Sequence, residues 1–352
     1  MTKRVVVGLS GGVDSAVAAC ILKQKGYDVI GLTLRTWESD AGKMSRCCDI
    51  DDARAVAAKL GIPYHVVNCA YDFKEKVIAP FVNDYISGIT PNPCVVCNRV
   101  LKWERMMYMA KVLSADLVAT GHYANVVKLD NGRYTLKQAD ASKDQTYMLY
   151  ALSQEQLLHT LMPLGGMTKD EVRAVAKDAG IPVAEKADSQ EICFVADDDY
   201  AAYIAENHEG ELPGEGDFVD ESGRVLGRHK GIINYTVGQR KGLGIAMGHP
   251  VFVKKIDAAK NEVILSDDEA LYTDTVRCRN VNFMSICGIK EGERIRCLAR
   301  IRYHHLPQEA EALMEGDTLV IRFASPVRAA APGQSAVMYD ETGCIIGGGV
   351  IM

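Results

Sequence analysis

The run Gly8-Leu9-Ser10-Gly11-Gly12-Val13-Asp14-Ser15 directly follows the apolar residues Val5-Val6-Val7. After it, apolar side chains recur at helical spacing, at Val13, Val17, Cys20 and Ile21. The order strand, glycine-rich turn, helix start directs backbone N–H groups and the positive end of a helix dipole toward an anion. Glycine lets the backbone approach a phosphate closely, and Ser10 and Ser15 add hydroxyl donors. The sequence therefore predicts a phosphate-binding loop.

The details of this run exclude two common phosphate loops. A Walker A loop ends in Gly-Lys-Ser/Thr, and a dinucleotide fingerprint reads Gly-x-Gly-x-x-Gly; neither is present. The string Ser-Gly-Gly-Val-Asp-Ser resembles instead the pyrophosphate-binding loop of enzymes that cleave ATP into AMP and pyrophosphate. The alternative interpretation is a plain tight turn in an α/β protein.

Composition limits the class of protein. The chain has 352 residues, 48% of them hydrophobic, and a net charge of -6. No apolar run is long enough to span a membrane, and the N-terminus has no signal-peptide pattern. We therefore expect a cytoplasmic protein with no membrane partner. The net charge does not decide whether nucleic acid binds, because groove potentials depend on local arrangement.

The first half of the chain alternates strands and helices. We expect strands at 4–9, 28–34, 63–67 and 116–120, and helices near 14–26, 50–61, 71–87, 98–113, 144–150, 168–179 and 197–207. This alternation predicts an α/β fold with a doubly wound parallel sheet. Ligands of such sheets bind outside the carboxyl ends of the strands, which is where the loop at 8–15 falls.

The pattern changes near Asn207. Residues 209–244 are rich in glycine, and from 250 onward short strands alternate with turns. Regular short strands without helices indicate a small β-barrel or sandwich. We therefore expect three domains, with boundaries near 207 and 272: a catalytic domain at 1–207, a small β-rich central domain at 208–272 and a C-terminal β-barrel at 273–352.

Some of the eleven cysteines occupy positions that suggest chemistry. Cys94 and Cys97 form a C-x-x-C spacing after two prolines, where a helical pattern begins, and a helix N-terminus favours the reactive thiolate. Cys193 lies in a polar setting unsuited to a core. These three favour redox or sulfur chemistry, with an iron–sulfur cluster or plain structural thiols as alternatives. We interpret the adjacent Cys47 and Cys48 as structural or as weak metal ligands.

Further polar residues follow predicted strands or occupy loops. His122 follows the strand at 116–120 and could orient a substrate or contact phosphate, or be an ordinary surface histidine. Asp144 begins a predicted helix and could simply cap it. Cations alternate along Arg300-Ile301-Arg302, which suits a phosphate-contacting ribbon or a solvated edge. Two adjacent cations, Arg240 and Lys241, lie between glycines.

Taken in order along the chain, these motifs resemble the tRNA-specific 2-thiouridylases, which thiolate the wobble uridine of certain tRNAs. The matching stretches are 8–15, 90–99, 120–124, 142–147, 188–194, 235–245, 300–303 and 326–339. The resemblance implies an adenine nucleotide alpha hydrolase-like N-terminal domain, a central β-rich domain and a C-terminal barrel that contacts tRNA. Many members carry aspartate where this chain has Cys94.

The resemblance also implies roles for individual residues. Cys97 would be the catalytic nucleophile and Cys193 the cysteine that carries a persulfide, with a disulfide between them after sulfur transfer. The target base would face Asn92, Pro93 and Cys94. ATP would be bound by Gly8, Leu9, Ser10, Gly11, Gly12, Val13, Asp14, Ser15, Leu34 and Gly121. The tRNA would be contacted by His122, Lys143, Asp144, Gln145, Arg302, Tyr303 and Gln334.

The implied reaction activates the C2 oxygen of uridine 34 by adenylation and replaces it with persulfide sulfur, giving 2-thiouridine, AMP and pyrophosphate. ATP and Mg²⁺ would be required, and a cysteine desulfurase or relay protein would donate sulfur. The resemblance suggests tRNAs for Lys, Glu and Gln. Alternatives are a [4Fe–4S] thiolase using Cys94, Cys97 and Cys193, another ATP-pyrophosphatase-type ligase or amidotransferase, and a tRNA-binding or sulfur-carrier protein without catalysis.

Overall fold

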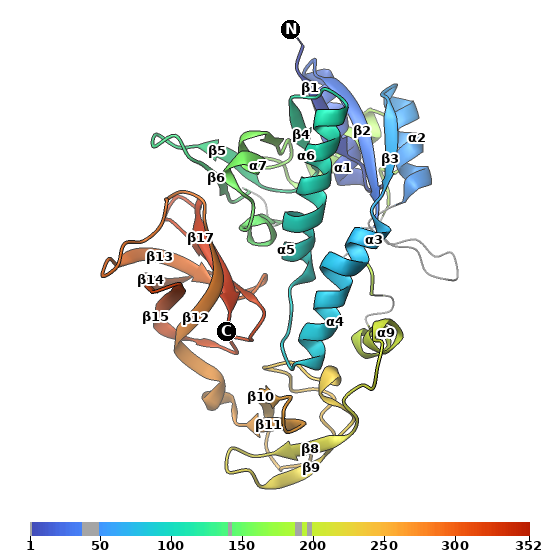
Figure 1. The fold of residues 1–352 in the computed structure, drawn as a ribbon. Helices are drawn as coiled ribbons and strands as arrows, with labels where there is room; N and C mark the ends of the chain where they lie inside the picture. Colours follow the sequence, from blue (N-terminus) through green and yellow to red (C-terminus); the bar gives the residue numbers. More distant parts are fainter. Residues whose placement is uncertain (1, 37–48, 140–142, 187–191, 196–198) are drawn as a thin grey trace.

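The computed structural model describes residues 2–36, 49–139, 143–186, 192–195 and 199–352. Three parts follow one another along the ribbon, each built around its own sheet (Figure 1). None of the helices in the described ranges combines the length and the apolar character needed to cross a membrane. The predicted order, a parallel α/β sheet followed by two β-rich parts, is confirmed.

The N-terminal part is built on a parallel sheet of five strands in the order β3-β2-β1-β4-β7. Val5, Val6 and Val7 of β1 are fully buried, as expected for a strand covered on both faces. The chain moves outward from β1 to β2 and β3 on one side, and β4 pairs with β1 on the other, so the winding reverses between β1 and β4. The strands are β1 Arg4–Gly8, β2 Asp28–Arg35, β3 Tyr64–Asn68, β4 Leu117–Ala119 and β7 Thr160–Leu161.

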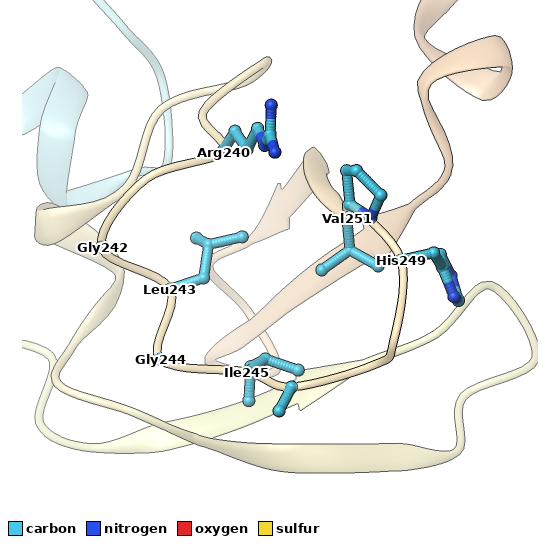
Figure 2. Close-up of a pocket in the computed structure, with 9 residues that line it drawn as sticks. Arg240, Gly242, Leu243, Gly244, Ile245, His249 and Val251 are labelled. Atoms are coloured by element: carbon cyan, nitrogen blue, oxygen red, sulfur yellow. The ribbon is translucent and has the colours of Figure 1, made fainter.

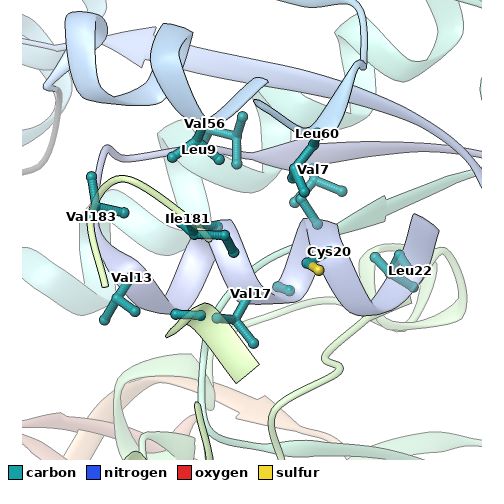
Figure 3. Packing of buried hydrophobic residues seen from close by; sticks show 14 of the residues in the cluster. Val7, Leu9, Val13, Val17, Cys20, Leu22, Val56, Leu60, Ile181 and Val183 are labelled. Carbon is teal, nitrogen blue, oxygen red and sulfur yellow. The ribbon is translucent and has the colours of Figure 1, made fainter. Parts of the chain in front are cut away.

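Helix α1 packs against this sheet through its apolar face. Val13, Val17 and Cys20 lie in one buried cluster with Val7 of β1 and Val56 of the neighbouring helix α2 (Figure 3). The helices around this sheet are α1 Val13–Gln24, α2 Ile50–Leu60, α7 Gln154–Leu158 and α8 Lys169–Asp178. Helix α9 Tyr200–Asn207 lies apart from the sheet and packs in a cluster with Phe81.

Two long helical segments leave the sheet toward the centre of the molecule (Figure 1). Each contains a π-helical turn, a geometry common at functional sites. An ion pair between Arg105 and Asp72 joins them. The first segment is α3 Ala70–Phe73, η1 Lys74–Ile78 and α4 Ala79–Ile86; the second is α5 Pro93–Cys97, η2 Asn98–Trp103 and α6 Glu104–Val112.

The central part is a four-stranded sheet in the order β10-β11-β8-β9 with a small core around Phe218 and Val253. The C-terminal part is a closed barrel in the order β12-β15-β14-β13-β16-β17. The central strands are β8 Gly216–Val219, β9 Val225–His229, β10 Phe252–Asp257 and β11 Glu262–Ser266. The barrel strands are β12 Tyr272–Phe283, β13 Ile295–Arg300, β14 Gln308–Glu315, β15 Thr318–Arg328, β16 Ser335–Tyr339 and β17 Ile345–Ile351.

The barrel packs tightly on the N-terminal part. A Cβ at Gly348 of β17 would lie 2.8 Å from the ring of Tyr150, so only glycine allows this approach. Tyr150 belongs to the segment after the short helix η3 Thr146–Leu149. Residues of both parts share one buried cluster, among them Tyr147 and Val337.

The predicted strands of the first sheet agree with the observed ones to within one or two residues. Several features differ from the prediction. Strand β7 and helix α7 were not predicted, and the helix expected at 144–150 is the shorter 3-10 helix η3. The helix expected at 98–113 begins earlier, at Pro93, because Asn92 caps it. The hairpin of β5 Asn125–Lys128 and β6 Tyr134–Lys137 was not anticipated, since its strands are only four residues long.

Candidate functional site

The glycine loop lies where β1 ends and α1 begins. The Ser15 side chain closes it: the Ser10 backbone N–H donates to Ser15 Oγ at 3.1 Å, and Ser15 Oγ donates to the Gly12 carbonyl at 3.0 Å. Gly11 has a φ of +77°, and a Cβ there would lie 2.5 Å from the Asp49 carbonyl oxygen. This position therefore requires glycine both for its backbone conformation and for space.

Gly121 presses against the same loop from the end of β4. A Cβ at this position would lie 2.6 Å from the carbonyl carbon of Asp14 and 2.6 Å from the backbone nitrogen of Ser15. The loop and Gly121 thus meet at the carboxyl edge of the sheet, where the winding reverses between β1 and β4. Open α/β sheets bind their ligands at this kind of crevice.

Asp14 is held by two residues that the sequence analysis did not identify. Its Oδ1 accepts a hydrogen bond from the Tyr123 hydroxyl at 2.8 Å and pairs with Lys169 Nζ at 2.7 Å. Lys169 begins α8, in the first turn, where the helix dipole disfavours a cation. That unfavourable placement is the one local signal by which the sequence could have singled out Lys169.

A second lysine reaches the loop from the other side. Lys186 Nζ pairs with Asp49 at 2.8 Å and Asp52 at 2.5 Å. Asp49 caps α2, and its carbonyl is the group that meets Gly11. Both lysines are therefore paired with acidic side chains beside the loop. A polyphosphate bound to the loop would compete with those acidic side chains for the two lysines.

Cys97 and Cys193 come together in one hydrophobic cluster. Cys97 is buried, with 7% of its surface exposed, and Cys193 is half-buried against the same cluster. The ring of Phe194 lies 5.4 Å from that of Phe73 and meets other aromatic rings nearby. Burial, reinforced by the neighbouring Cys193 thiol, raises the pKa of Tyr203. The two cysteines that the resemblance assigns to sulfur transfer thus belong to the same hydrophobic cluster, Cys97 within it and Cys193 at its partly exposed side.

Leu34 connects the two sites. It lies near the carboxyl end of β2 and packs against both the sheet cluster that contains Leu32 and the cysteine cluster. A ligand at the carboxyl edge of the sheet would therefore have the cysteine cluster as its neighbour.

The cysteine loop is capped and stiffened by its own residues. Asn92 Oδ1 accepts the Val95 backbone N–H at 3.4 Å, and Pro93 fills the first position of α5. Cys94, one residue further, is half-buried.

Within the ranges that the structure describes, no three His, Cys, Asp or Glu side chains are grouped to hold a metal ion. Cys94, Cys97 and Cys193 all lie in those ranges and are not grouped in this way. Asp14, the one acid of the glycine loop, is already paired with Lys169.

His122 lies near the loop but is not a cation. Its Nδ1 is 2.9 Å from Thr120 Oγ1, and its ring lies 5.6 Å from that of Trp103. Burial, with a smaller effect from Lys102, lowers the pKa of His122 to about 3. The imidazole is therefore neutral at physiological pH and acts only as a hydrogen-bonding or packing group.

Three neighbouring residues predicted to contact tRNA point to different places. Lys143 is exposed. Gln145 accepts the Tyr123 backbone N–H through Oε1 at 3.0 Å. Asp144 accepts Thr146 Oγ1 at 2.9 Å and pairs with Arg300 Nη1 at 3.3 Å. Of the three side chains, that of Lys143 is the one presented to solvent.

The Asp144–Arg300 pair joins the N-terminal part to the barrel. Each side chain is only 13% exposed, and the Arg300 guanidinium lies 5.2 Å from the Tyr339 ring centroid. The Tyr339 hydroxyl is in turn 3.2 Å from Thr146 Oγ1. Asp144 is therefore an internal connector in this structure.

The barrel contributes the remaining residues predicted to contact tRNA. Tyr303 packs against Tyr147, with ring centroids 6.2 Å apart, and against His304 at 4.8 Å. Arg302 is half-exposed and donates to the Arg328 carbonyl at 3.3 Å. Gln334 turns inward to the cysteine loop.

A separate cavity of about 290 Å³ lies in the central part (Figure 2). Leu243, Ile245 and Val251 form its apolar lining, and Arg240 and His249 stand at its rim. It contains none of the residues assigned to ATP or to sulfur. Some sequence predictions lie outside the described residues: those for Cys47, Cys48, Ser142 and the segment 188–191.

Comparison with known protein families matches the whole chain in three consecutive pieces. Residues 3–197 match the family described as tRNA methyl transferase HUP domain. Residues 203–267 match its PRC-barrel domain, and residues 273–351 match the aminomethyltransferase beta-barrel domain.

Curated relatives match over their full length. The chain is 47% identical to the tRNA-specific 2-thiouridylase MnmA of Lachnoclostridium phytofermentans, over 99% of each chain. It is 48% identical to the protein of the same name from Clostridioides difficile, over 100% of this chain and 98% of that protein. Among solved structures, the U34-tRNA thiolase NcsA from Methanococcus maripaludis with its [4Fe-4S] cluster gives a TM-score of 0.35 at 21% identity. That match covers 58% of this chain and 63% of the thiolase, and supports no functional inference.

Proposed function

The chain belongs to the tRNA-specific 2-thiouridylase family, and we propose that its glycine loop and cysteine cluster act in succession on the wobble uridine. The protein is a tRNA-uridine 2-sulfurtransferase that forms 2-thiouridine in tRNA and uses ATP. The proposal concerns which residues carry out each step. The main support is that Cys97 and Cys193 belong to one hydrophobic cluster, which Leu34 links to the carboxyl edge of the sheet.

In the first step, the loop Gly8–Ser15 binds the phosphates of ATP, with Gly121 and Leu34 bordering the nucleotide. The uracil C2 oxygen attacks the α-phosphorus and pyrophosphate leaves. Lys169 stabilises the charge that develops on the departing pyrophosphate by exchanging its pairing with Asp14. Mg²⁺, when bound with the nucleotide, would neutralise phosphate charge. The one carboxylate of the loop, Asp14, is paired with Lys169, so the phosphates would supply most of the ligands.

In the second step, sulfur replaces the activated oxygen. The terminal sulfur of a persulfide on Cys193 attacks C2, and AMP leaves with the former C2 oxygen. Cys97 thiolate then attacks the Cys193 sulfur, which breaks the S–S bond, leaves sulfur on C2 and forms a Cys97–Cys193 disulfide. A cellular thiol reductant restores both thiols. In the alternative order, Cys97 first releases the terminal sulfur as hydrosulfide, which then attacks C2 with the same net change.

The target base has to leave its stack to reach Cys97, which costs a few kcal/mol and least in a single-stranded loop. We propose that Asn92, Pro93 and Cys94 border the base. Lys143, His122, Arg302 and Tyr303 are proposed to face the tRNA, with Asp144, Gln145 and the inward-turned Gln334 supporting them from within. We further propose that the chain divides into domains at 1–207, 208–272 and 273–352 and that the protein acts in the cytoplasm.

We also propose that tRNAs for Lys, Glu and Gln are the acceptors and that a cysteine desulfurase or relay protein donates the persulfide sulfur. The grouping of Cys94, Cys97 and Cys193 does not favour a cluster-dependent thiolase. Iron analysis of anaerobically purified, fully active enzyme tests that alternative: a stoichiometric cluster would support it.

The substitution Cys193→Ser tests the persulfide role. We expect the variant to form no 2-thiouridine by mass analysis of tRNA, while ATP binding and tRNA-dependent pyrophosphate release persist. Cys287→Ser is the matched control, because Cys287 is an exposed thiol on the barrel. This variant should thiolate tRNA at the wild-type rate. Thiolation at the wild-type rate by Cys193→Ser would refute the role.

A further inference from the structure

A loop of the barrel lies directly on the backbone that leads into the cysteine helix. Gln334 Nε2 donates to the Thr90 carbonyl at 3.2 Å and to the Pro91 carbonyl at 3.1 Å. The Thr90 N–H donates back to the Pro332 carbonyl at 2.9 Å. The contact is close: a Cβ at Gly333, which has a φ of +91°, would lie 2.4 Å from Ile89 and 2.7 Å from the Thr90 oxygen.

These bonds hold the residues that set the direction of α5. Thr90 and Pro91 immediately precede Asn92, the cap of the helix that carries Cys94 and Cys97. Proline at 91 and 93 restricts the backbone further. Fixing the two carbonyls therefore fixes where the helix starts and where Cys97 lies relative to Cys193.

A second contact holds the same loop from beside it. The Tyr147 hydroxyl donates to the Ser335 carbonyl at 2.8 Å, one residue after Gln334. Tyr147 is fully buried, which raises the pKa of its hydroxyl, and the Asn92 side chain offsets part of that rise. The barrel thus anchors the cysteine loop at Thr90 and Pro91, and Tyr147 holds the barrel loop in turn.

We propose that Gln334 is a positioning residue for sulfur transfer, and that its amide orients Cys97 before tRNA arrives. An amide nitrogen has two hydrogens, and both are used here on successive backbone carbonyls. Only Oε1 then remains available for RNA, and only as an acceptor. The inference rests on the proposed function in naming Cys97 as the reacting thiol.

Gln334→Glu is the sharpest test, because it keeps size and shape but places an acceptor against two carbonyl oxygens. Gln334→Met keeps the length of the side chain and introduces no charge. It replaces Gln334→Glu as the test if that variant does not fold. Gln308→Glu, the same change at the start of β14 in the same barrel, is the matched control. Folding of each full-length variant is checked by circular dichroism and thermal unfolding.

The first readout uses no tRNA. Iodoacetamide labelling of Cys97, followed by peptide mass analysis, should accelerate about threefold or more in both Gln334 variants, because a loosened loop exposes a buried thiol. Labelling of Cys287 should not change. A residue that only contacts tRNA would leave this measurement at the wild-type rate. The labelling rate of Cys97 tests the positioning role even if the Cys193→Ser variant refutes the persulfide role.

The second readout separates kcat from KM. Thiolation by Gln334→Glu and Gln334→Met should show a kcat lowered about tenfold or more, as expected when two hydrogen bonds of ordinary strength are lost. The KM for tRNA should stay within about twofold of wild type, as expected if the amide makes no RNA contact. An unchanged Cys97 labelling rate or an unchanged kcat in a folded Gln334 variant overturns the proposal, and a raised KM alone would make Gln334 an RNA contact.

Discussion

Gly121→Ala should disable the nucleotide site while leaving the fold in place. The added Cβ would lie 2.6 Å from the backbone of Asp14 and Ser15, whereas ordinary contact begins at 3.4 Å. The start of α1 or the end of β4 therefore has to move by about 0.8 Å. Neither is a flexible side chain that could turn aside, so the displacement is passed to the glycine loop.

Two magnitudes follow from that displacement. Overpacking of this kind costs about 1–3 kcal/mol of unfolding free energy. A misplacement near 1 Å of groups that hold a reacting substrate costs up to about 100-fold in rate. We therefore expect kcat/KM for ATP to fall about 10- to 100-fold in Gly121→Ala.

The assay is pyrophosphate release that depends on added tRNA, measured over a range of ATP concentrations, with urea unfolding as the check on stability. Gly166→Ala is the matched control, since a Cβ there meets nothing within 4 Å, and it should behave as wild type. If folded Gly121→Ala kept kcat/KM for ATP within about twofold of wild type, the close approach of β4 to the loop would not matter for nucleotide binding.

Three other perturbations follow from the structure. Lys169→Met should lower kcat/KM for ATP about 10- to 100-fold, because a charge-assisted contact beside Asp14 is lost. A wild-type kcat/KM for ATP in the pyrophosphate-release assay would contradict this. Since burial lowers the pKa of His122 to about 3, its neutral form stabilises the fold above pH 6.5, and this contribution is lost as the pH falls toward 3, by up to about 1.4 kcal/mol per pH unit. The unfolding free energy of His122→Phe should therefore decline less steeply below pH 6.5 than that of the wild type. Parallel plots of unfolding free energy against pH for the two proteins would refute the lowered pKa of His122. Asp144→Ala should cost about 3–5 kcal/mol in denaturant unfolding, because it leaves Arg300 buried without its counter-charge; a loss under about 1 kcal/mol would show that the pair is not a structural connector.

The sequence was sufficient for the features that depend on local pattern. Buried strands such as β1 are continuous apolar runs, and the turn that follows combines glycines with serines and aspartate, so both could be recognised without tertiary information. The carboxyl-edge rule then placed the loop at 8–15 and Gly121 together. The helix at 93–112 was placed less well, because an asparagine cap followed by proline started it five residues earlier than the apolar pattern indicated.

Long-range polar partners could not be predicted in this way. Lys169 meets Asp14 across 155 residues, and Arg300 meets Asp144 across 156. Nothing in the local sequence of either partner specifies the other. The sequence does not tell whether a polar residue in a functional motif faces a substrate or the protein interior. Asp144, which pairs with the buried Arg300, faces the interior.

The attachment of Gln334 to Thr90 also has a consequence for synthesis on the ribosome. The two residues are separated by 244 positions, which take roughly 12–50 s to translate at about 5–20 residues per second. During that interval the nascent chain carries the loop of Cys97 without its final support. A product truncated before β16 would expose an unanchored, oxidisable thiol pair, so we expect such fragments to be preferred substrates for proteolysis rather than partly active enzymes.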